Sequence, residues 1–230
     1  MAFRYKNVLD IVRTSLDSLK VSGEYIMVDN LSLLSKTDPK IRHYASLLRD
    51  GVQFILSTVP TPEVLGLTRS ITILNSGENE SIGLYEMPSD VYRMLSISDG
   101  VHRYGFRYEH GDNSHRNGGY NGYTYTLALG NIVIDNARGV PPQEIVLKYV
   151  SGAVYRVTLG DEGTQLGMDF TNDKDIVLID YNLVSKAFKR EYAKVNDDTA
   201  LASLDYEYKH VLAQVTGDNT SPSARIDVRG

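Results

Sequence analysis

The sequence predicts an α+β protein: an antiparallel helical bundle formed by N- and C-terminal helix pairs, with an inserted antiparallel β domain and an extended C-terminal tail. Apolar residues recur at helical spacing in the first 60 residues and again from about residue 173. Short segments rich in β-branched residues, separated by tight turns, fill the region between these two parts. The expected boundaries are 1–66 and 171–216 for the two helical parts, 67–170 for the β domain and 217–230 for the tail.

Two helices are expected in the N-terminal part. The segment Phe3–Lys20 carries one apolar stripe at three- and four-residue spacing, and Gly23 follows its basic end as a stop signal. The second helix is expected to begin at Thr37-Asp38-Pro39, which supplies a capping side chain followed by Pro in the first turn. Its apolar stripe ends at Pro60, which cannot continue a helix.

The middle of the chain changes to the period of β-strands. Turn signals such as Asp99-Gly100 recur about every ten residues, which favours an antiparallel sheet or a small barrel over β-α-β units. The polar segment Glu109–Gly122 is too long for a simple hairpin turn. The predicted strands cover residues 69–74, 81–85, 91–97, 101–108, 123–129, 131–135 and 144–150.

Helical spacing returns near residue 173, although Ile176–Ile179 could equally be a strand. The linker Asn196–Thr199 also supplies an N-cap, and Leu201–Val215 is expected to be the last helix. No predicted helix can bury a core alone, so the simplest arrangement packs the first two against the last two. From Gly217 onward there is almost nothing to bury, which indicates an extended tail.

The composition argues against several classes of protein. Cysteine is absent, which excludes disulfides, cysteine-ligated metals and cysteine nucleophiles. A formal net charge of -5 argues against a general nucleic-acid binder. No apolar run approaches the roughly 18 residues of a membrane span. The charged N-terminus lacks the apolar segment of a signal peptide, so neither a span nor a leader is expected.

Motifs of catalysis are sparse. The chain has no nucleophile elbow, no P-loop and no dinucleotide fingerprint. His102, His110 and His115 lie near several carboxylates and could bind a divalent ion if the side chains converged. A Gly-rich segment does not hold such a geometry, so a solvated loop is favoured over a metal site. We therefore predict no catalytic residue, no metal site and no cofactor.

Tyrosines gather around the long polar loop. The chain has 16 Tyr, 5 Phe and no Trp, and Tyr120 and Tyr123 lie at the end of the loop. Tyrosine combines apolar contact area with a polar tip and is enriched in interfaces, so a protein–protein interface is favoured. Packing within the sheet and a platform for a ligand are the open alternatives.

The tail carries one regular pattern. Ile226 and Val228 alternate between Arg225 and Arg229, and such an alternation could add a strand to the edge of a partner's sheet. Without a partner in view, the composition favours a disordered tail.

Four segments, taken in order, carry a likeness to a known family. They are Leu48–Leu56 at the end of the second helix, Tyr85–Ile97 with its Met-Pro-Ser-Asp turn, the Tyr-ending strand Glu144–Tyr149, and the closing helix pair Ala187–Val215. In these respects the chain resembles the head-to-tail adaptor (connector ring) proteins of tailed bacteriophages, including the tail tubular protein A group. A short-tailed phage of the crAss-like kind would fit.

The resemblance implies a structural, non-enzymatic subunit of a homo-oligomeric ring, in twelve copies, that joins the portal protein to the next tail or ring protein. DNA would pass through the ring without sequence-specific binding, and no membrane is involved. The ring would belong to the neck or tail of a virion that assembles in the host cytoplasm. An acidic chain suits a wall that DNA passes without adhering, because basic residues would bind its phosphates.

The resemblance also implies that the tail orders on binding the portal. The predicted portal contacts are Ser223, Arg225, Ile226, Asp227, Val228 and Arg229. The predicted interface loop on the tail side consists of His110, Asn113, His115, Tyr120 and Tyr123. Two other functions stay open: a metal-dependent hydrolase that uses the three histidines, and a virion carbohydrate-binding module that uses the two tyrosines.

Overall fold

The structure is a computed structural model in which the chain divides into two compact units. Unit 1 comprises residues 1–67 and 152–230, and unit 2 is the continuous stretch Thr68–Ser151. The structure describes residues 4–19, 38–60, 62–77, 82–106, 124–135, 140–159, 163–196 and 198–217. No helix within these ranges is long and apolar enough to cross a membrane.

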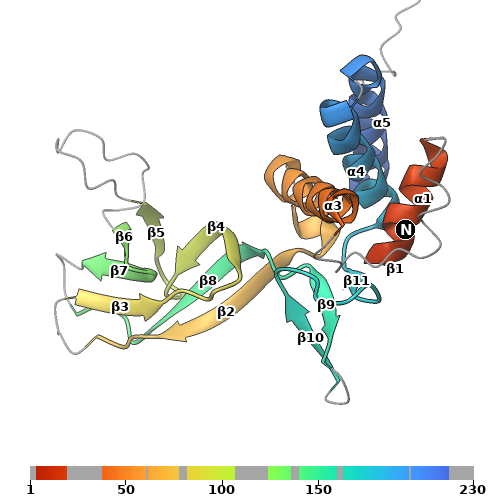
Figure 1. Ribbon diagram of the computed structural model, residues 1–230. Helices are drawn as coiled ribbons and strands as arrows, with labels where there is room; N and C mark the ends of the chain where they lie inside the picture. Colours follow the sequence, from red (N-terminus) through yellow and green to blue (C-terminus); the bar gives the residue numbers. More distant parts are fainter. Residues whose placement is uncertain are drawn as a thin grey trace, which may run out of the picture. The chain divides into compact units, whose positions relative to one another are not determined.

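Unit 1 combines helices with a small sheet (Figure 1). Its helical elements are α1 (Val8–Ser18), α3 (Pro39–Thr58), the 3-10 helix η1 (Pro62–Leu65), α4 (Tyr181–Asn196) and α5 (Asp198–Thr216). Its strands are β1 (Lys6–Asn7), β9 (Tyr155–Thr158), β10 (Thr164–Gly167) and β11 (Ile176–Val177). The strands form an antiparallel sheet in the order β1-β11-β9-β10.

Side-chain caps set the start of the two N-terminal helices. The Asn7 Oδ1 atom accepts a hydrogen bond of 2.7 Å from the backbone N–H of Asp10. Asp38 caps α3 in the same way, since its Oδ1 atom lies 2.8 Å from the backbone nitrogen of Lys40. Each cap satisfies an N–H group that has no partner within the helix. The cap at Asp38 and the following Pro39 confirm the start predicted for the second helix.

Helix α4 is the centre of the helical packing, because α1, α3 and α5 all lie against it. The closest approach is at Gly51 of α3, where an added Cβ atom would lie 3.0 Å from the backbone nitrogen of Phe188. Because Gly51 carries only a hydrogen atom in place of a side chain, the backbones of α3 and α4 can approach each other closely at this point. The buried side chains include Ile11, Val12 and Leu16 of α1, Leu48, Val52 and Ile55 of α3, and Leu183, Val184 and Phe188 of α4.

A buried carboxylate ties the small sheet to α1. Asp175 is fully buried, and its side chain accepts backbone N–H bonds from Thr158, Thr171 and Asn172 at 2.7–3.0 Å. Its backbone oxygen accepts a further bond of 2.9 Å from Val8, the first residue of α1. Several N–H donors compensate the cost of burying this charge.

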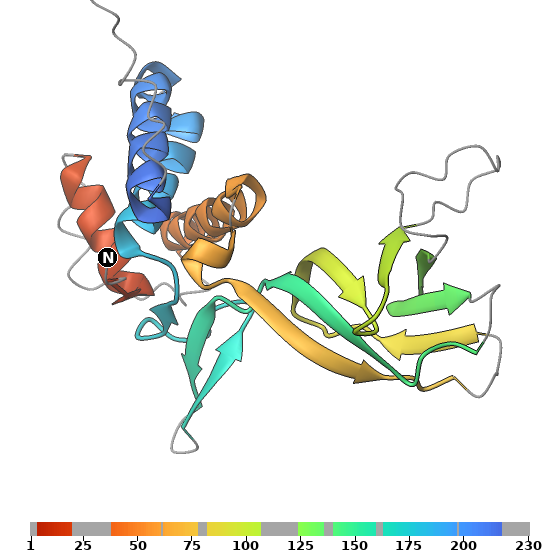
Figure 2. The same cartoon turned by 180° about the vertical axis from the view of Figure 1, so that it is seen from behind.

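Unit 2 is a curled seven-stranded sheet in the order β2-β8-β4-β5-β6-β7-β3. Its strands are β2 (Thr68–Leu74), β3 (Ile82–Glu86), β4 (Val91–Ser98), β5 (Arg103–Phe106), β6 (Thr124–Ala128), β7 (Asn131–Asp135) and β8 (Glu144–Ser151). Figures 1 and 2 both show the long strands β2 and β8 running side by side. Its buried core consists of Tyr85, Ile97, Tyr104, Ile132, Ile134, Ile145, Leu147 and Tyr149.

The two outer strands of unit 2 meet, which curls the sheet. The Asn75 Oδ1 atom accepts a hydrogen bond of 3.0 Å from the backbone N–H of Leu84. The Ser76 N–H donates to the backbone oxygen of the same leucine at 2.8 Å. These bonds join the end of β2 to β3, so the apolar side chains on the inner face enclose one core.

The predicted fold class, a helical bundle with an inserted antiparallel β domain, is wrong. Strands outnumber helices in the described part of the chain, and unit 1 is not a bundle because it holds its own four-stranded sheet. Residues 152–170, which the sequence places in the β domain, belong to unit 1. The sheet of unit 2 is not antiparallel throughout either, since β5 and β6 pair in parallel.

The physical reason for the error lies in short strands. β1 and β11 have two residues each, too few to show a period, and they form only because they pair with distant segments.

The parallel pair in unit 2 has a different origin, because parallel neighbours such as β5 and β6 need a long connection. The length of the segment between these two strands, residues 107–123, is consistent with that need.

Candidate functional site

The residues predicted to make contacts lie outside the described part of the chain. The loop residues His110, Asn113, His115, Tyr120 and Tyr123 fall within 107–123, and the tail residues Ser223, Arg225, Ile226, Asp227, Val228 and Arg229 fall within 218–230. Both sets therefore stay predictions.

Of the three histidines that the sequence analysis weighed as metal ligands, His102 lies in the described part of the chain, and it takes part in a hairpin turn. Its Nδ1 atom lies 3.2 Å from the Oδ2 atom of Asp99. Over the ranges that the structure describes, no three His, Asp or Glu side chains gather closely enough to hold a metal ion. The pairing of His102 with Asp99 therefore belongs to the turn.

Asp99 closes the turn between β4 and β5. Its Oδ1 atom accepts the backbone N–H groups of Val101 and His102 at 2.9 and 2.6 Å, and its Oδ2 atom accepts the Tyr104 hydroxyl at 2.8 Å. Burial of the carboxylate raises its pKa, but the hydrogen bonds outweigh burial and lower the pKa to about 2. Such a carboxylate is a weak base, so its role is to hold the turn.

A second carboxylate joins two of the segments on which the family resemblance rests. Asp90 ends the Met-Pro-Ser-Asp turn, and Tyr149 ends the later strand. The Tyr149 hydroxyl donates to Asp90 Oδ1 at 3.0 Å, and the Ser151 hydroxyl donates to Oδ2 at 2.6 Å. Burial and the bond to Asp90 raise the pKa of Tyr149 to about 12, so this tyrosine stays a neutral donor at ordinary pH.

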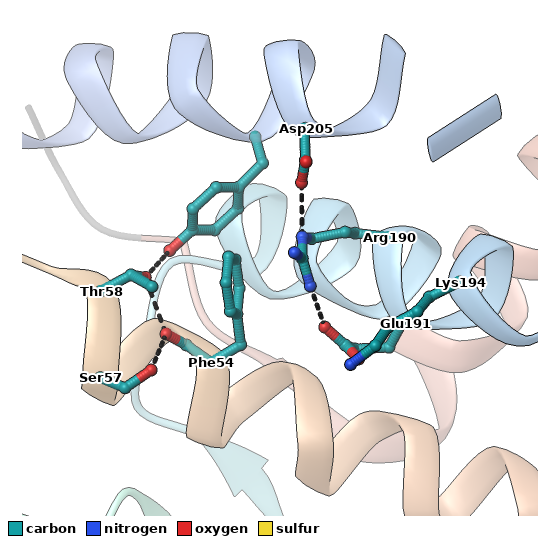
Figure 3. A network of polar contacts seen from close by, with 8 residues as sticks. Phe54, Ser57, Thr58, Arg190, Glu191, Lys194 and Asp205 are labelled. Carbon is teal, nitrogen blue, oxygen red and sulfur yellow. Dashed lines mark hydrogen bonds and ion pairs between the residues drawn. The ribbon is translucent and has the colours of Figure 1, made fainter. Parts of the chain in front are cut away.

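In unit 1, a polar cluster lies where α3, α4 and α5 meet (Figure 3). The Arg190 Nε atom donates to Asp205 Oδ1 of α5 at 2.5 Å, and its Nη1 atom donates to Glu191. The guanidinium lies 3.9 Å from the ring centroid of Phe54 of α3. Burial alone would lower the pKa of Arg190, but the two carboxylates raise it, so the group keeps its charge.

The rest of this cluster is paired as well. Lys194 lies 3.5 Å from Glu191, and the hydroxyls of Tyr208 and Thr58 are hydrogen-bonded at 2.9 Å. Both carboxylates of the cluster, Glu191 and Asp205, are engaged by Arg190, so neither is available as a general base. The cluster forms a junction between three helices.

Arg49, from the first segment of the resemblance, anchors α3 to the segment after β10. Its Nε atom donates to Asp169 at 2.8 Å, and its guanidinium lies 4.5 Å from the ring centroid of Phe170. The Phe170 ring packs on Tyr155 of β9 with a centroid distance of 5.6 Å. The Tyr155 hydroxyl is buried without a hydrogen-bond partner in the described structure, and burial raises its pKa.

Exposed apolar side chains mark one end of unit 2. Leu74 ends β2, Ile82 begins β3, Val101 lies in the β4–β5 turn, and Val140 precedes β8. The register places Leu74 and the β4–β5 turn at the end opposite to Thr68 and Ser151, where the chain enters and leaves the unit. The contact of Asn75 with Leu84 brings the start of β3 to the same end, and Val140 lies four positions before the first residue of β8. We call these four residues the apolar end. Apolar groups gathered on a surface are typical of protein contacts.

The turn between β6 and β7 presents another exposed apolar residue. Leu129 is 100% exposed and has a φ of 51°, with Gly130 at 78°. Turns of this kind prefer Asn, Asp or Gly at both positions, because a bulky side chain is strained at positive φ. A fully exposed leucine in this conformation contributes nothing to the core of the unit.

Sequence reasoning missed the contacts of Asp90 and of Arg190. Asp90 and Tyr149 are 59 positions apart, so no local pattern indicates their hydrogen bond. A signal did exist for Arg190, because α4 carries Lys186, Lys189, Arg190 and Lys194, whereas α5 carries Asp205 and Glu207.

No protein-family model matches the chain, and no curated protein sequence matches it significantly.

Proposed function

We propose that this protein is a structural subunit of an oligomeric ring that joins the portal of a tailed bacteriophage to its tail and lines the DNA conduit. The observation that carries the proposal is the hydrogen bonding of Asp90 to Tyr149 and Ser151. It brings together the turn and the Tyr-ending strand, two of the segments in which the chain resembles adaptor proteins. A resemblance to a family that rests on separate segments gains weight when those segments contact each other in the fold.

The layout of the chain supports the same proposal. Segments from both ends of the chain build unit 1, and unit 2 is continuous. The apolar end of unit 2 offers a surface for another protein. We assign that surface to the next tail or ring protein, on the side where the loop 107–123 is predicted to act.

Charge also suits a DNA conduit. A formal charge of -5 per chain becomes -60 in a ring of twelve copies. Phosphates release bound counterions when they meet Lys and Arg, which makes basic surfaces adhere to DNA. A net acidic ring avoids that adhesion while DNA moves through it.

The test uses the full chain with the portal and tail proteins of its own virus. Native mass spectrometry and negative-stain microscopy should find a ring of this chain on the portal. The double variant Val101→Glu, Val140→Glu should still join the portal but bind the next tail protein at least tenfold more weakly. The control variant Ser70→Glu, Thr72→Glu on the exposed face of β2 should behave like the wild type.

A chain that stays monomeric and has affinity for neither the portal nor the tail protein contradicts the proposed function. The portal must be present in this experiment, because the proposal concerns a ring that assembles on it.

A further inference from the structure

Strand β10 is an edge of the four-stranded sheet in unit 1. Thr164–Gly167 pairs with β9 along its whole length, and β10 is the last strand in the sheet order. Within the described ranges, no other strand pairs with its second side. That side therefore offers N–H and C=O groups to an added strand.

This edge lacks the features that usually protect edge strands. Natural proteins block such edges with charged side chains, proline or a bulge. The run from Gly163 to Met168 contains neither a charged residue nor proline, and its register with β9 is regular. An open edge of this kind is a liability for a protein unless a partner strand covers it.

The exposed face of β10 is also apolar. Leu166 of the strand is 46% exposed, and Met168, in the bend that directly follows β10, is 49% exposed. Leu166 pairs with the exposed Arg156, whereas Gln165 pairs with the buried Val157. An added strand with apolar residues at alternate positions would cover this face.

The tail of the chain has the matching pattern. Ile226 and Val228 alternate in the same way as Leu166 and Met168. The tail segment is flanked by Arg225 and Arg229, whereas β10 is preceded in the sequence by the acidic residues Asp161 and Glu162. The two segments are therefore complementary in both apolar spacing and charge.

We propose that the segment Arg225–Arg229 of one copy pairs with β10 of the neighbouring copy and adds a fifth strand to its sheet. This inference rests on the proposed ring, because a contact between two different surfaces repeats from copy to copy and forms a ring when the rotation between copies closes. Helix α5 ends at Thr216, and the eight residues from Gly217 to Ala224 can span about 26 Å when extended. The tail thus has a partner within the ring as well as the portal contact predicted from the sequence.

The absence of cysteine makes a direct test simple. One preparation carries Leu166→Cys and a second carries Ile226→Cys or Val228→Cys. The two are mixed, with and without the portal, and oxidised mildly. If the tail of one copy pairs with β10 of another, which we call strand exchange, a disulfide-linked dimer forms between the two kinds of chain. We expect this dimer to be several-fold more abundant than in the control. The matched control replaces Leu166→Cys by Leu129→Cys, which is fully exposed in unit 2.

Cross-linking no stronger than in the control overturns the inference, whether or not a ring forms. A third preparation carries Leu166→Cys and Ile226→Cys in the same chain. A disulfide that forms only within this chain, and never between two chains, also overturns the inference, because the tail then binds its own β10. A ring on the portal without the cross-link leaves the proposed function standing and rejects strand exchange alone. A cross-link without any ring supports the strand pairing and counts against the portal-bound ring.

A second measurement does not require cysteines. Amide hydrogen exchange over residues 164–168 should slow at least tenfold in the assembled chain relative to the chain truncated after Asn219. Equal exchange in the two proteins under assembling conditions contradicts the pairing.

Discussion

Single carboxylates hold the turns of this protein in place. Asp99 accepts two N–H groups and a hydroxyl in the β4–β5 turn, and Asp90 accepts two hydroxyls beside β8. Asp175 does the same for the small sheet of unit 1. Charge-assisted hydrogen bonds of this kind are stronger than neutral ones, so a few residues determine the path of long connections.

Asp99 gives this part of the molecule a defined dependence on pH. Its pKa falls from the ordinary 3.8 to about 2 on folding, so the stabilisation is complete above pH 4 and is lost as pH falls toward 2. Urea unfolding should find wild type more stable than Asp99→Asn at pH 5, and the difference should shrink by about 1 kcal/mol at pH 3.

The matched control for this prediction is Glu86→Gln, which removes an exposed carboxylate from β3 of the same unit. Its difference from wild type should change much less between the two pH values. A difference for Asp99→Asn that stays constant from pH 5 to pH 3 contradicts the assigned role.

Opposite charges align the helix pair α4 and α5. Lys186 pairs with Glu207, and Arg190 pairs with Asp205, which fits two antiparallel helices. Within the same cluster, Arg190 is 17% exposed and Glu191 9% exposed, whereas Lys194 is 59% exposed. Burial decides how much each pair contributes, because water screens an exposed pair.

Two substitutions around the same carboxylate test this reasoning. Arg190→Met should lower the free energy of unfolding by about 3 kcal/mol, because Glu191 and Asp205 lose their shared guanidinium in a partly buried site. Lys194→Met should cost less than about 1 kcal/mol. Urea unfolding followed by the helical circular dichroism signal measures both. Equal losses for the two variants would mean that the junction does not depend on burial.

Unit 2 enters and leaves the rest of the chain at one point. Thr68 and Val150 are direct partners in the pairing of β2 with β8. Their Cα atoms therefore lie about 5 Å apart, the usual spacing across an antiparallel pair. Removal of the unit leaves two chain ends that a short linker can join, so unit 1 does not need unit 2 to bring its segments together.

A shortened chain in which Gly-Ser-Gly replaces residues 68–151 should fold. Its circular dichroism should retain the helical signal, and its thermal unfolding should stay cooperative, because the buried side chains of unit 1 all remain. The control extends the deletion through Thr158 and removes β9 with the buried Tyr155 and Val157. That control should lose cooperative unfolding, and a shortened chain that behaves like the control would contradict the division into units.

Local patterns account for the elements that the sequence predicts well. The cap at Asp38, the proline after it and the apolar stripe place α3 from neighbouring residues alone. The same holds for the strands with alternating apolar residues, such as β2 and β8. The small sheet of unit 1 escapes such patterns, because β1 and β11 pair across about 170 residues of the chain.

The candidate functional surfaces also divide into those that local sequence patterns indicate and those that only the tertiary structure reveals. The sequence singled out the loop 107–123 and the tail, and both lie outside the described residues, so their roles stay predictions. It did not point to β10 as an open edge, because an edge is a property of the order of strands in a sheet. The pattern of the tail indicates a specific partner only together with an unprotected strand edge of matching spacing.

The sequence by itself determined where helices and most strands lie, the absence of cysteine chemistry and the acidic balance of the chain. These properties depend on residues a few positions apart or on composition alone. The tertiary structure decided that unit 1 contains a sheet and that the carboxylates of Asp90 and Asp175 accept hydrogen bonds from distant residues. It also decided that β10 lies at the edge of its sheet. The reason is that hydrogen-bond pairing and burial join residues distant in the chain, and no local pattern encodes which distant segment will be the partner.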